Sequence, residues 1–406
     1  MSNAISITKE KMFIPYGCSV HGQDEIDAVV NCLKTSTQMG KHVSEMEQKV
    51  SALHDKKYGI MVNSGSSANY LSIELLNLPK GSEVITTVLT FSTVVAPLVK
   101  NDLIPVFVDV EEGTYNIDVD KVEQMISSKT KAMMIPNLLG NLPNWHKLRV
   151  LADKYNLVLI EDSCDTLGAK IDGKLAGRFA DVSITSFYGS HVINCAGNGG
   201  MLCVNNNEWN SKAKLLRSWG RSSSLFVESE AIENRFNIDI AGIRYDAKFI
   251  FEALGYNLEP SEMGAAFGLV QLAKLQKNID ARNKWFDKQL AFFKQYEDWF
   301  ILPKTLENCH TAWLSFPLTV KESAPFTRTE MQIFLEKCNI QTRTVFTGNI
   351  LSQPGFKDIP HKAAKEGYPN ADQVTRGGIL LAAHHGLTQA MIDYIHESFR
   401  SFVTQL

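Results

Sequence analysis

The stretch Leu157-Val-Leu-Ile-Glu161-Asp162 decides the fold, because it is an apolar run that ends in two carboxylates. Six further apolar or β-branched runs resemble it, and most are separated by segments long enough for a crossover helix. These runs cover residues 58–63, 83–87, 104–110, 131–136, 182–186 and 201–204. Runs that are apolar on both faces are typical of parallel strands covered by helices on each side. We therefore expect an α/β fold with a mostly parallel seven-stranded sheet.

The chain changes character after about residue 270. A helical stretch over 272–296 is followed by a strand candidate at 313–320 and by helix patterns at 328–337 and 388–402. We predict a large α/β domain with an N-terminal segment over residues 1–270, and a smaller α+β domain over 271–406. Residues 222–246 are polar and aperiodic, which predicts a long loop or insertion. Ahead of the sheet, apolar residues share one face of a helix in which Ser44 and Glu47 have capping-box spacing.

Composition excludes several classes of function. The 406 residues are 44% apolar, enough for a large core, and 41 Lys and Arg face 44 Asp and Glu, for a net charge of −3. This balance favours neither nucleic acid nor an anionic membrane. We find no apolar run of membrane-spanning length and no apolar signal-peptide core, so we expect a cytoplasmic protein. The seven cysteines are scattered without CxxC spacing, which indicates free thiols.

Three segments of the expected sheet carry side chains suited to ligand binding. Asn63-Ser-Gly-Ser-Ser-Ala-Asn69 follows a strand and opens a helix, so its N–H groups and hydroxyls either bind a phosphate or only cap the helix. Asp162 ends a buried strand at the edge where open α/β sheets bind ligands, although a solvated strand end fits equally well. Phe91 is either a core residue or a stacking platform. The glycines at 197, 199 and 200 precede a strand, which excludes a dinucleotide loop.

In their order and spacing these segments resemble the DegT/DnrJ/StrS-type sugar aminotransferases that use pyridoxal phosphate, a family with the aspartate aminotransferase fold (fold type I). The resemblance runs from about Tyr16 to the C-terminus. It rests on Ser64-Gly-Ser-Ser-Ala-Asn69, residues 108–118, Glu161-Asp162, Ser186-Phe-Tyr188, Gly255-Tyr-Asn257-Leu258 and Gly386-Leu-Thr388. The implied cofactor-binding residues are Gly65, Ser66, Ser67, Phe91, Asp162, Asp165, Ser186 and Asn257.

The resemblance also assigns roles within this set. Gly65, Ser66 and Ser186 hold the cofactor phosphate, and Phe91 stacks on the ring. Asp162 pairs with the ring nitrogen, because an ionised carboxylate keeps that nitrogen protonated and so makes the ring an electron sink. In the family, the residue that matches Asn257 reaches the phosphate of the neighbouring subunit, which implies a homodimer with shared active sites.

A histidine stands where the family has its cofactor lysine, in Thr185-Ser-Phe-Tyr-Gly-Ser-His191-Val-Ile-Asn-Cys-Ala-Gly-Asn-Gly-Gly200. It cannot form the covalent bond by which the lysine holds the cofactor, but it can move protons. A single loop histidine is usually only a hydrogen-bonding residue, yet its place in this loop favours catalysis. The replacement resembles a small branch of the family, the 3-dehydratases of nucleotide-linked 4-keto-6-deoxy sugars. Residues 136–141, 161–165, 219–221, 343, 348–349 and 353–354 share this resemblance.

The branch implies a reaction with pyridoxamine phosphate as the working cofactor. His191 removes a proton from the cofactor, the sugar loses its C3 hydroxyl to give a 4-keto-3,6-dideoxy sugar and ammonia, and L-glutamate restores the amine, leaving 2-oxoglutarate. The expected substrate is GDP-4-keto-6-deoxymannose or a GDP-4-keto-6-deoxy-heptose. Arg221, Arg244 and Arg343 are candidate contacts for diphosphate or carboxylate, because arginine binds both bidentately. Ser222 to Ser224 stand where a CDP-sugar relative has cysteines, so we expect no iron–sulfur cluster and no metal.

Two alternatives remain open at this point. One is a nucleotide-sugar 4-aminotransferase in which His191 has replaced the cofactor lysine, in nature or in the laboratory. The other is a catalytically silent member that binds a nucleotide sugar or a partner protein. Restored transamination in His191→Lys, without deoxygenation by the parent, would favour the first. Absence of a cofactor-dependent spectral change with glutamate would favour the second.

Overall fold

The large sheet contains all seven predicted strands. The computed structural model describes residues 12–226, 231–236 and 238–406. The strands lie in the order β1-β9-β8-β5-β4-β2-β3, and all are parallel except β9, which is antiparallel to both neighbours. Their bounds are β1 (Tyr58–Val62), β2 (Glu83–Thr87), β3 (Ile104–Val108), β4 (Thr130–Pro136), β5 (Val158–Asp162), β8 (Val182–Ser186) and β9 (Gly200–Val204). The predicted α/β fold with a mostly parallel sheet is confirmed.

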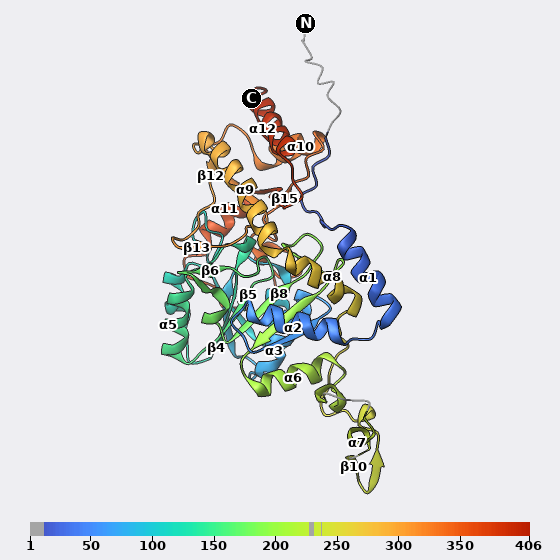
Figure 1. Cartoon of the computed structure of the whole chain (residues 1–406). Coiled ribbons are helices and arrows are strands. Elements are labelled where there is room, and N and C mark those ends of the chain that lie inside the picture. Colours follow the sequence, from blue (N-terminus) through green and yellow to red (C-terminus); the bar gives the residue numbers. More distant parts are fainter. Residues whose placement is uncertain (1–11, 227–230, 237) are drawn as a thin grey trace.

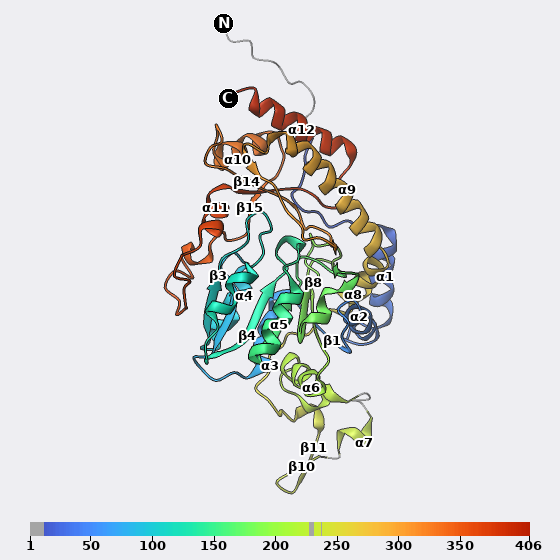
Figure 2. The same cartoon turned by 90° about the vertical axis from the view of Figure 1, so that its left-hand side faces the viewer.

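Helices cover both faces of this sheet (Figures 1 and 2). One face packs against α3 (Gly65–Leu76), α4 (Ser92–Lys100) and α6 (Asn207–Arg217). The other packs against α2 (Lys41–Ala52), α5 (Trp145–Tyr155) and α8 (Glu262–Ala273). Successive strand residues alternate between the faces, so Ile60 and Val62 join the α3 side while Met61 joins the α2 side. Burial of each such side chain contributes about 1.5–3 kcal/mol.

Helix α2 begins differently from the prediction. The helix starts at Lys41 with Gly40 as its N-cap, so the capping box predicted for Ser44 and Glu47 is wrong. The carboxylate of Glu262, on the distant helix α8, accepts instead from the backbone N–H groups of Gly40, His42 and Val43, at 2.8, 2.7 and 3.2 Å. A carboxylate at this position satisfies free N–H groups and matches the positive end of the helix dipole. No local sequence pattern marks a cap that arrives from elsewhere in the chain.

A second, antiparallel sheet follows in the order β12-β14-β16-β15. Its strands are β12 (Phe300–Ile301), β14 (Phe316–Val320), β15 (Arg343–Thr344) and β16 (Gly378–Leu381), and the helices nearby are α9 (Leu275–Phe293), α10 (Arg328–Lys337), α11 (Pro369–Gly377) and α12 (Gln389–Val403). The helical stretch predicted over 272–296 consists of the end of α8, α9 and a short 3₁₀ turn. One apolar cluster contains side chains of this second sheet together with Val88 and Leu139, which follow strands β2 and β4 of the large sheet. The domain boundary at residue 270 stays a prediction.

An arm projects from the body of the molecule at the predicted insertion (Figures 1 and 2). It contains α7 (Ile232–Arg235) and a hairpin of β10 (Ile238–Ile240) and β11 (Ile243–Tyr245). Several of its apolar side chains are exposed, including Ile232 and Ile243. The remaining elements are α1 (Gln23–Thr35), β6 (Lys170–Ile171), β7 (Lys174–Leu175) and β13 (Cys309–His310).

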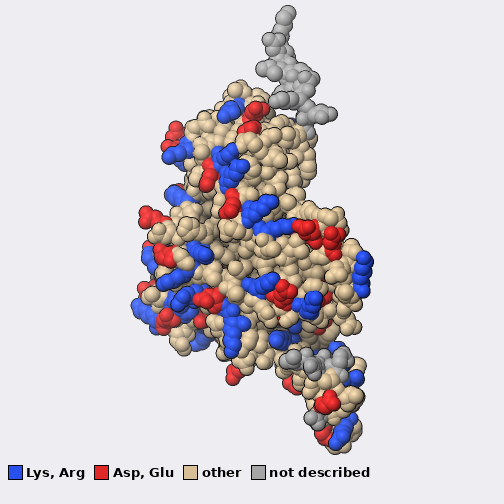
Figure 3. Space-filling view, viewed as in Figure 1, with Lys and Arg blue, Asp and Glu red and all other residues tan. Residues whose placement is uncertain are grey.

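The surface and the cysteines agree with the composition. On the face drawn in Figure 3, Lys and Arg are intermixed with Asp and Glu. All seven cysteines are free thiols, as predicted. Within the described part of the chain, no helix has both the length and the apolar content needed to cross a membrane.

Candidate active site

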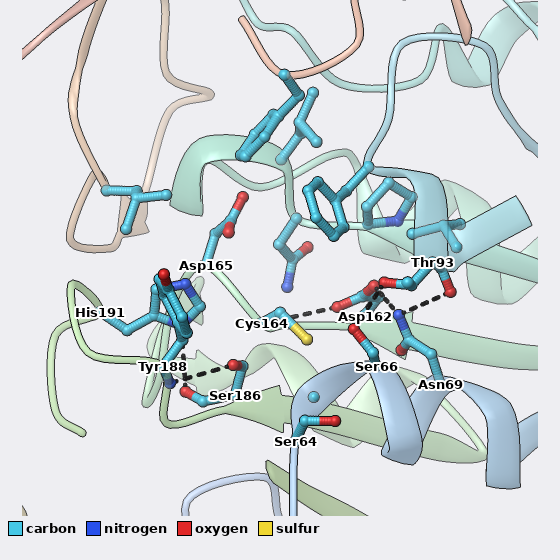
Figure 4. A pocket seen from close by; sticks show the side chains of 18 of the residues that line it. Ser64, Ser66, Asn69, Thr93, Asp162, Cys164, Asp165, Ser186, Tyr188 and His191 are labelled. Atoms are coloured by element: carbon cyan, nitrogen blue, oxygen red, sulfur yellow. Dashed lines mark hydrogen bonds between the residues drawn. The ribbon is translucent and has the colours of Figure 1, made fainter. Parts of the chain in front are cut away.

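A cavity of about 560 Å³ opens at the carboxyl ends of β4, β5 and β8, beside the first turn of α3 (Figure 4). This is the edge of an open α/β sheet where ligands bind. The predicted site residues that line it are Gly65, Ser66, Phe91, Asp162, Asp165, Ser186 and His191. Residues from four separate segments of the chain therefore meet at one place, while their roles stay predictions.

One end of the cavity is suited to an anion. Ser64 is the N-cap of α3 and its Oγ accepts from Ser67 N at 3.1 Å, so the simple capping interpretation holds for this residue. Gly65 and Ser66 open the helix and face the cavity together with Ser186. A Cβ on Gly65 would lie 2.6 Å from the Ser186 Cβ, so only glycine allows this approach. A helix N-terminus with free N–H groups and nearby hydroxyls fits a phosphate.

Asp162 supplies a buried carboxylate to the cavity. Its Oδ2 accepts from Asn69 Nδ2 at 2.8 Å, and its Oδ1 accepts from Cys164 N at 3.0 Å. Burial raises the pKa of Asp162, hydrogen bonds from Cys164 and Asn69 oppose that change, and the charge of Glu161 adds to it. An anion held this way is stabilised by any cation that enters the cavity. A protonated ring nitrogen is such a cation. The alternative of a solvated strand end is wrong, because the side chain is only 6% exposed.

His191 faces the cavity as a neutral imidazole. Its Nδ1 lies 3.3 Å from the carbonyl oxygen of Ser186, which requires a proton on Nδ1 and leaves the Nε2 lone pair free. Burial lowers the pKa of His191 to about 4; the hydrogen bond that Nδ1 donates to the Ser186 carbonyl opposes this change, and the charge of Arg282 adds to it. The side chain is therefore available as a base at neutral pH.

A buried arginine holds the loop that carries His191 by hydrogen bonds to backbone carbonyl groups. Arg282 of α9 donates from Nη2 to the Ser190 carbonyl oxygen and from Nη1 to the Leu314 carbonyl oxygen, both at 2.9 Å. Its guanidinium is 1% exposed. No local sequence pattern indicates this contact, because Arg282 lies on a helix 92 residues beyond Ser190 in the chain.

Aromatic side chains lie at another edge of the cavity. Phe91 is the N-cap residue of α4 and is 48% exposed, so its interpretation as a core residue is wrong. Its ring lies 6.0 Å from that of Phe346, at 73°. Phe346 lines the same cavity with a left-handed φ of 42°. Non-glycine residues are held in that region only by their surroundings, and such positions concentrate at binding sites.

The other predicted site residues lie outside the cavity lining. Ser67 Oγ donates to Asn63 Oδ1 at 2.6 Å within the helix cap. Arg221 stacks over Trp219, with 4.6 Å between guanidinium and ring centroid, and Arg343 lies 5.5 Å from the ring centroid of Tyr16. Arg244 is on the exposed hairpin of the arm, and Asn257 pairs with Ser218. Among these, Ser67 contacts the lining residue Ser64, and Arg343 contacts the lining residue Tyr16. Their roles stay predictions.

Several lining residues were missed as candidates. Asn69, Asn137 and Cys164 lie within the motifs that carried the resemblance, and their place beside the predicted residues was the available signal. Tyr16 comes from the N-terminal segment, for which no local pattern indicated a site. Within residues 12–226, 231–236 and 238–406, no group of three or more His, Cys, Asp or Glu is arranged to hold a metal ion.

Comparison with known proteins places the chain in a family. Residues 20–400 match the model of the DegT/DnrJ/EryC1/StrS aminotransferase family, and the chain belongs to this family. The lipopolysaccharide biosynthesis protein RfbH of Salmonella typhimurium is 34% identical over 96% of this chain and 91% of its own length. The dTDP-4-dehydro-2,6-dideoxy-D-glucose 3-dehydratase of Saccharopolyspora spinosa is 33% identical, over 96% and 86%.

Solved structures agree with these relatives. A structure of Escherichia coli GDP-4-keto-6-deoxy-D-mannose 3-dehydratase with bound hydrated pyridoxal phosphate matches with a TM-score of 0.85 and 27% identity, covering 95% of this chain and 100% of that one. Structures of GDP-4-keto-6-deoxymannose 3-dehydratase with bound GDP-perosamine and with a trapped PLP-glutamate geminal diamine match equally well. The predicted family and the aspartate aminotransferase-like fold are therefore confirmed.

Proposed function

We propose that this protein is a 3-dehydratase that removes the C3 hydroxyl of a nucleotide-linked 4-keto-6-deoxy sugar, with pyridoxal and pyridoxamine phosphate as cofactor and L-glutamate as amino donor. The observation that carries the proposal is His191, a neutral imidazole with a free Nε2 at the position of the family's cofactor lysine, inside the cavity that contains Asp162. The names of the 3-dehydratases among its relatives support the same reaction.

The residues present fit the cofactor. Gly65, Ser66 and Ser186 would hold the phosphate at the first turn of α3, and Asp162 would pair with the ring nitrogen. Phe91, exposed at the cavity edge, would stack on the ring. A Cβ on Gly200 would lie 2.5 Å from Gly65 N, so the glycine lets β9 pack directly against the backbone that begins α3 at the phosphate end. When bound, the cofactor supplies an electron sink and an amine for a ketone.

His191 then acts as a proton carrier rather than as a covalent anchor. Its Nε2 accepts the proton that the reaction releases, while the Ser186 carbonyl holds Nδ1–H and so fixes the tautomer. Arg282 keeps the loop in place and disfavours a charged resting imidazole. Without a lysine, the phosphate, ring-nitrogen and stacking contacts are the means of retaining the cofactor.

Mass spectrometry of the sugar product tests the proposal. The protein is incubated with pyridoxal phosphate, L-glutamate and GDP-4-keto-6-deoxymannose, with the dTDP-linked and heptose analogues in parallel. Loss of one oxygen with release of ammonia is the expected result. A 4-amino sugar would instead support the aminotransferase alternative. Unchanged sugar in every reaction, with no glutamate-dependent spectral change, would contradict the proposal and favour the silent member.

We also infer a homodimer with shared sites. Ile232 is 70% exposed and Ile243 64% on the projecting arm, and Leu254, which follows the arm in the chain, is 98% exposed; a second copy of the chain would bury these side chains. The same contact would bring Asn257, and Arg221 or Arg244, toward the partner's cavity. Light scattering should give twice the chain mass, and a double change Ile243→Glu and Leu254→Glu should give a monomer. A wild-type monomer at micromolar concentration would contradict the inference.

A further inference from the structure

Asp165 is a second carboxyl group in the cavity, and it shares a side of the cavity with His191. In Figure 4 both side chains lie on one side, and Asp162 with Asn69 lies on the other. The Oδ2 atom of Asp165 accepts from Leu139 N at 2.8 Å. Among the described residues, Oδ1 has no hydrogen-bond partner, and it is not among the fully buried unpaired atoms. One oxygen is thus anchored, and the other is free to face a ligand.

The anchor for Asp165 is a strained turn held from several sides. Leu139 adopts a left-handed φ of 59°, which is unfavourable for a leucine and aims its N–H at the carboxylate. The Asn116 side chain accepts from Leu138 N at 3.1 Å, and the Leu139 carbonyl accepts from Leu314 N at 2.7 Å. A conformation that costs about 1–3 kcal/mol persists only where its surroundings impose it. The strain here fixes the direction of Asp165.

The electrostatic setting of Asp165 is opposite to that of His191. Burial raises the pKa of Asp165 to about 7, the charge of Asp162 acts in the same direction, and the Leu139 N–H opposes both. The other titratable groups around it are Tyr16, Cys164 and His191. At neutral pH the cavity therefore holds a neutral imidazole and a carboxyl group that is protonated in a large fraction of molecules. Two groups whose environments separate their pKa values in this way are suited to act as base and acid.

We propose that Asp165 is the general acid of the dehydration, donating a proton from Oδ1 to the C3 hydroxyl oxygen of the sugar. This inference rests on the proposed function. The C3–O bond breaks with its electron pair on oxygen, and the hydroxyl leaves as water. His191 accepts one proton and Asp165 supplies one, so the elimination step is balanced in protons. Replacing the C3 hydroxyl by hydrogen is a two-electron reduction of the sugar, and its electrons would come from the amine form of the cofactor, which becomes the aldehyde and is restored by L-glutamate. Asp165 then regains its proton from solvent.

The test uses Asp165→Asn, which keeps an oxygen to accept from Leu139 N but has no acidic proton. Asp358→Asn, at an exposed carboxylate, is the matched control. In single-turnover assays we expect Asp165→Asn to lower the rate of C3 deoxygenation about 10²- to 10⁴-fold. The assays use saturating pyridoxal phosphate, so that a change in cofactor affinity at Asp165, itself predicted to bind the cofactor, does not affect the measured rate. A substrate with fluorine in place of the C3 hydroxyl needs no proton for departure, so both proteins should release fluoride at similar rates.

The outcomes separate the two proposals. Equal rate losses with the hydroxyl and the fluoro substrate, or a normal rate with the hydroxyl substrate, would overturn the acid role while the dehydratase stands. A wild-type enzyme that forms no 3-deoxy product would overturn both. Infrared titration of the cofactor-free protein gives a readout independent of activity. It should show a carboxylic acid band that titrates near neutral pH and is absent in Asp165→Asn, and a wild-type protein without such a band would contradict the inference even if the variant does not fold.

Discussion

Glu161 and Asp162 are neighbouring carboxylates on β5, and strand alternation sends them to opposite sides of the sheet. Glu161 is fully enclosed by the protein: its Oε1 accepts from Asn137 Nδ2 at 2.9 Å and from Ser163 Oγ at 3.2 Å, and its Oε2 lies 3.5 Å from His54 Nδ1. Asp162 is directed at the cavity and contacts Asn69 and the Cys164 N–H.

The pKa values of the two carboxylates are consequently shifted in opposite directions. Burial alone would raise the pKa of Glu161, but hydrogen bonding and ion pairing with His54, with further help from Ser183 and Lys56, hold that pKa below its usual range. Burial raises the pKa of Asp162, because its partners do not offset the loss of water. The fold itself provides the counter-charge for Glu161 and leaves Asp162 to a ligand. That difference marks one as structural and the other as functional.

The largest effect that we expect is a loss of folding stability when Glu161 is replaced. Glu161→Ala removes a buried carboxylate, which leaves the donors of Asn137 and Ser163 unpaired and buried Lys56 without this nearby negative charge, and should lower the free energy of unfolding by about 3–5 kcal/mol. Asp162→Asn should leave it unchanged or slightly higher in the cofactor-free protein. Urea unfolding at pH 7 measures both. Equal losses in the two variants would contradict the assignment of separate roles.

Cofactor affinity should depend more on Asp162 than on Glu161, which is the reverse of the order expected for stability. Asp162→Asn removes a charge-assisted hydrogen bond to the ring nitrogen, an interaction worth about 1.5–3 kcal/mol, so affinity should fall about 10- to 100-fold. Glu161→Gln, which keeps most of its hydrogen bonds, should stay within a few-fold of wild type provided that it folds. Absorbance titration with pyridoxal phosphate measures both affinities. Weaker binding by the Glu161 variant alone would reverse the functional assignment.

The pH dependence of stability should have opposite signs at the two positions. Glu161, with a folded-state pKa below 4.5, stabilises the protein above that pH, and this contribution is lost as the pH falls through the folded value. Asp162, with a folded-state pKa above 3.8, favours folding below that pH, and the contribution is lost as the pH rises through the folded value. The stability difference between wild type and Glu161→Gln should therefore grow from acid to neutral pH. For Asp162→Asn the difference should shrink or change sign.

The smallest effect that we expect is a difference in cofactor affinity between variants of two adjacent serines, Ser66 and Ser67. Ser66 faces the cavity, whereas Ser67 Oγ is committed to Asn63 within the helix cap. Ser66→Ala should weaken cofactor binding by about 1 kcal/mol, or roughly five-fold, through the loss of one hydrogen bond to phosphate. Ser67→Ala should leave affinity within two-fold. Isothermal titration with pyridoxal phosphate distinguishes them, and equal losses would mean that both serines contact the phosphate.

Much of this site could be predicted because its residues lie at the ends of predicted strands. Parallel strands bring their carboxyl ends to one edge, so Asp162, Ser186 and the segment after β1 had to meet once the strands were recognised. The sequence did not show which side of β5 each carboxylate would face. Strand alternation separates Glu161 from Asp162, but only the positions of the covering helices determine which side opens to a cavity.

Contacts between distant segments could not be predicted. Arg282 and Glu262 act on loops and helices far away in the chain, and no local periodicity distinguishes a surface arginine or glutamate from one that caps a remote element. The hairpin within the arm was also missed, because strands of three residues leave too short an alternation to recognise. The direction of Ser67 depends on its place in the first turn of α3, and that followed only from where the helix begins.

The most direct test of the central claim compares wild type with His191→Lys on one sugar substrate, followed by mass spectrometry of the products. We predict that the wild-type protein, with a base in place of a covalent anchor, releases a 3-deoxy-4-keto sugar and ammonia in the presence of L-glutamate. The lysine variant should lose this deoxygenation and form a 4-amino sugar. If wild type gave no deoxygenated sugar while His191→Lys gave robust transamination, the protein would be an aminotransferase with a replaced lysine, and the dehydratase account would be wrong.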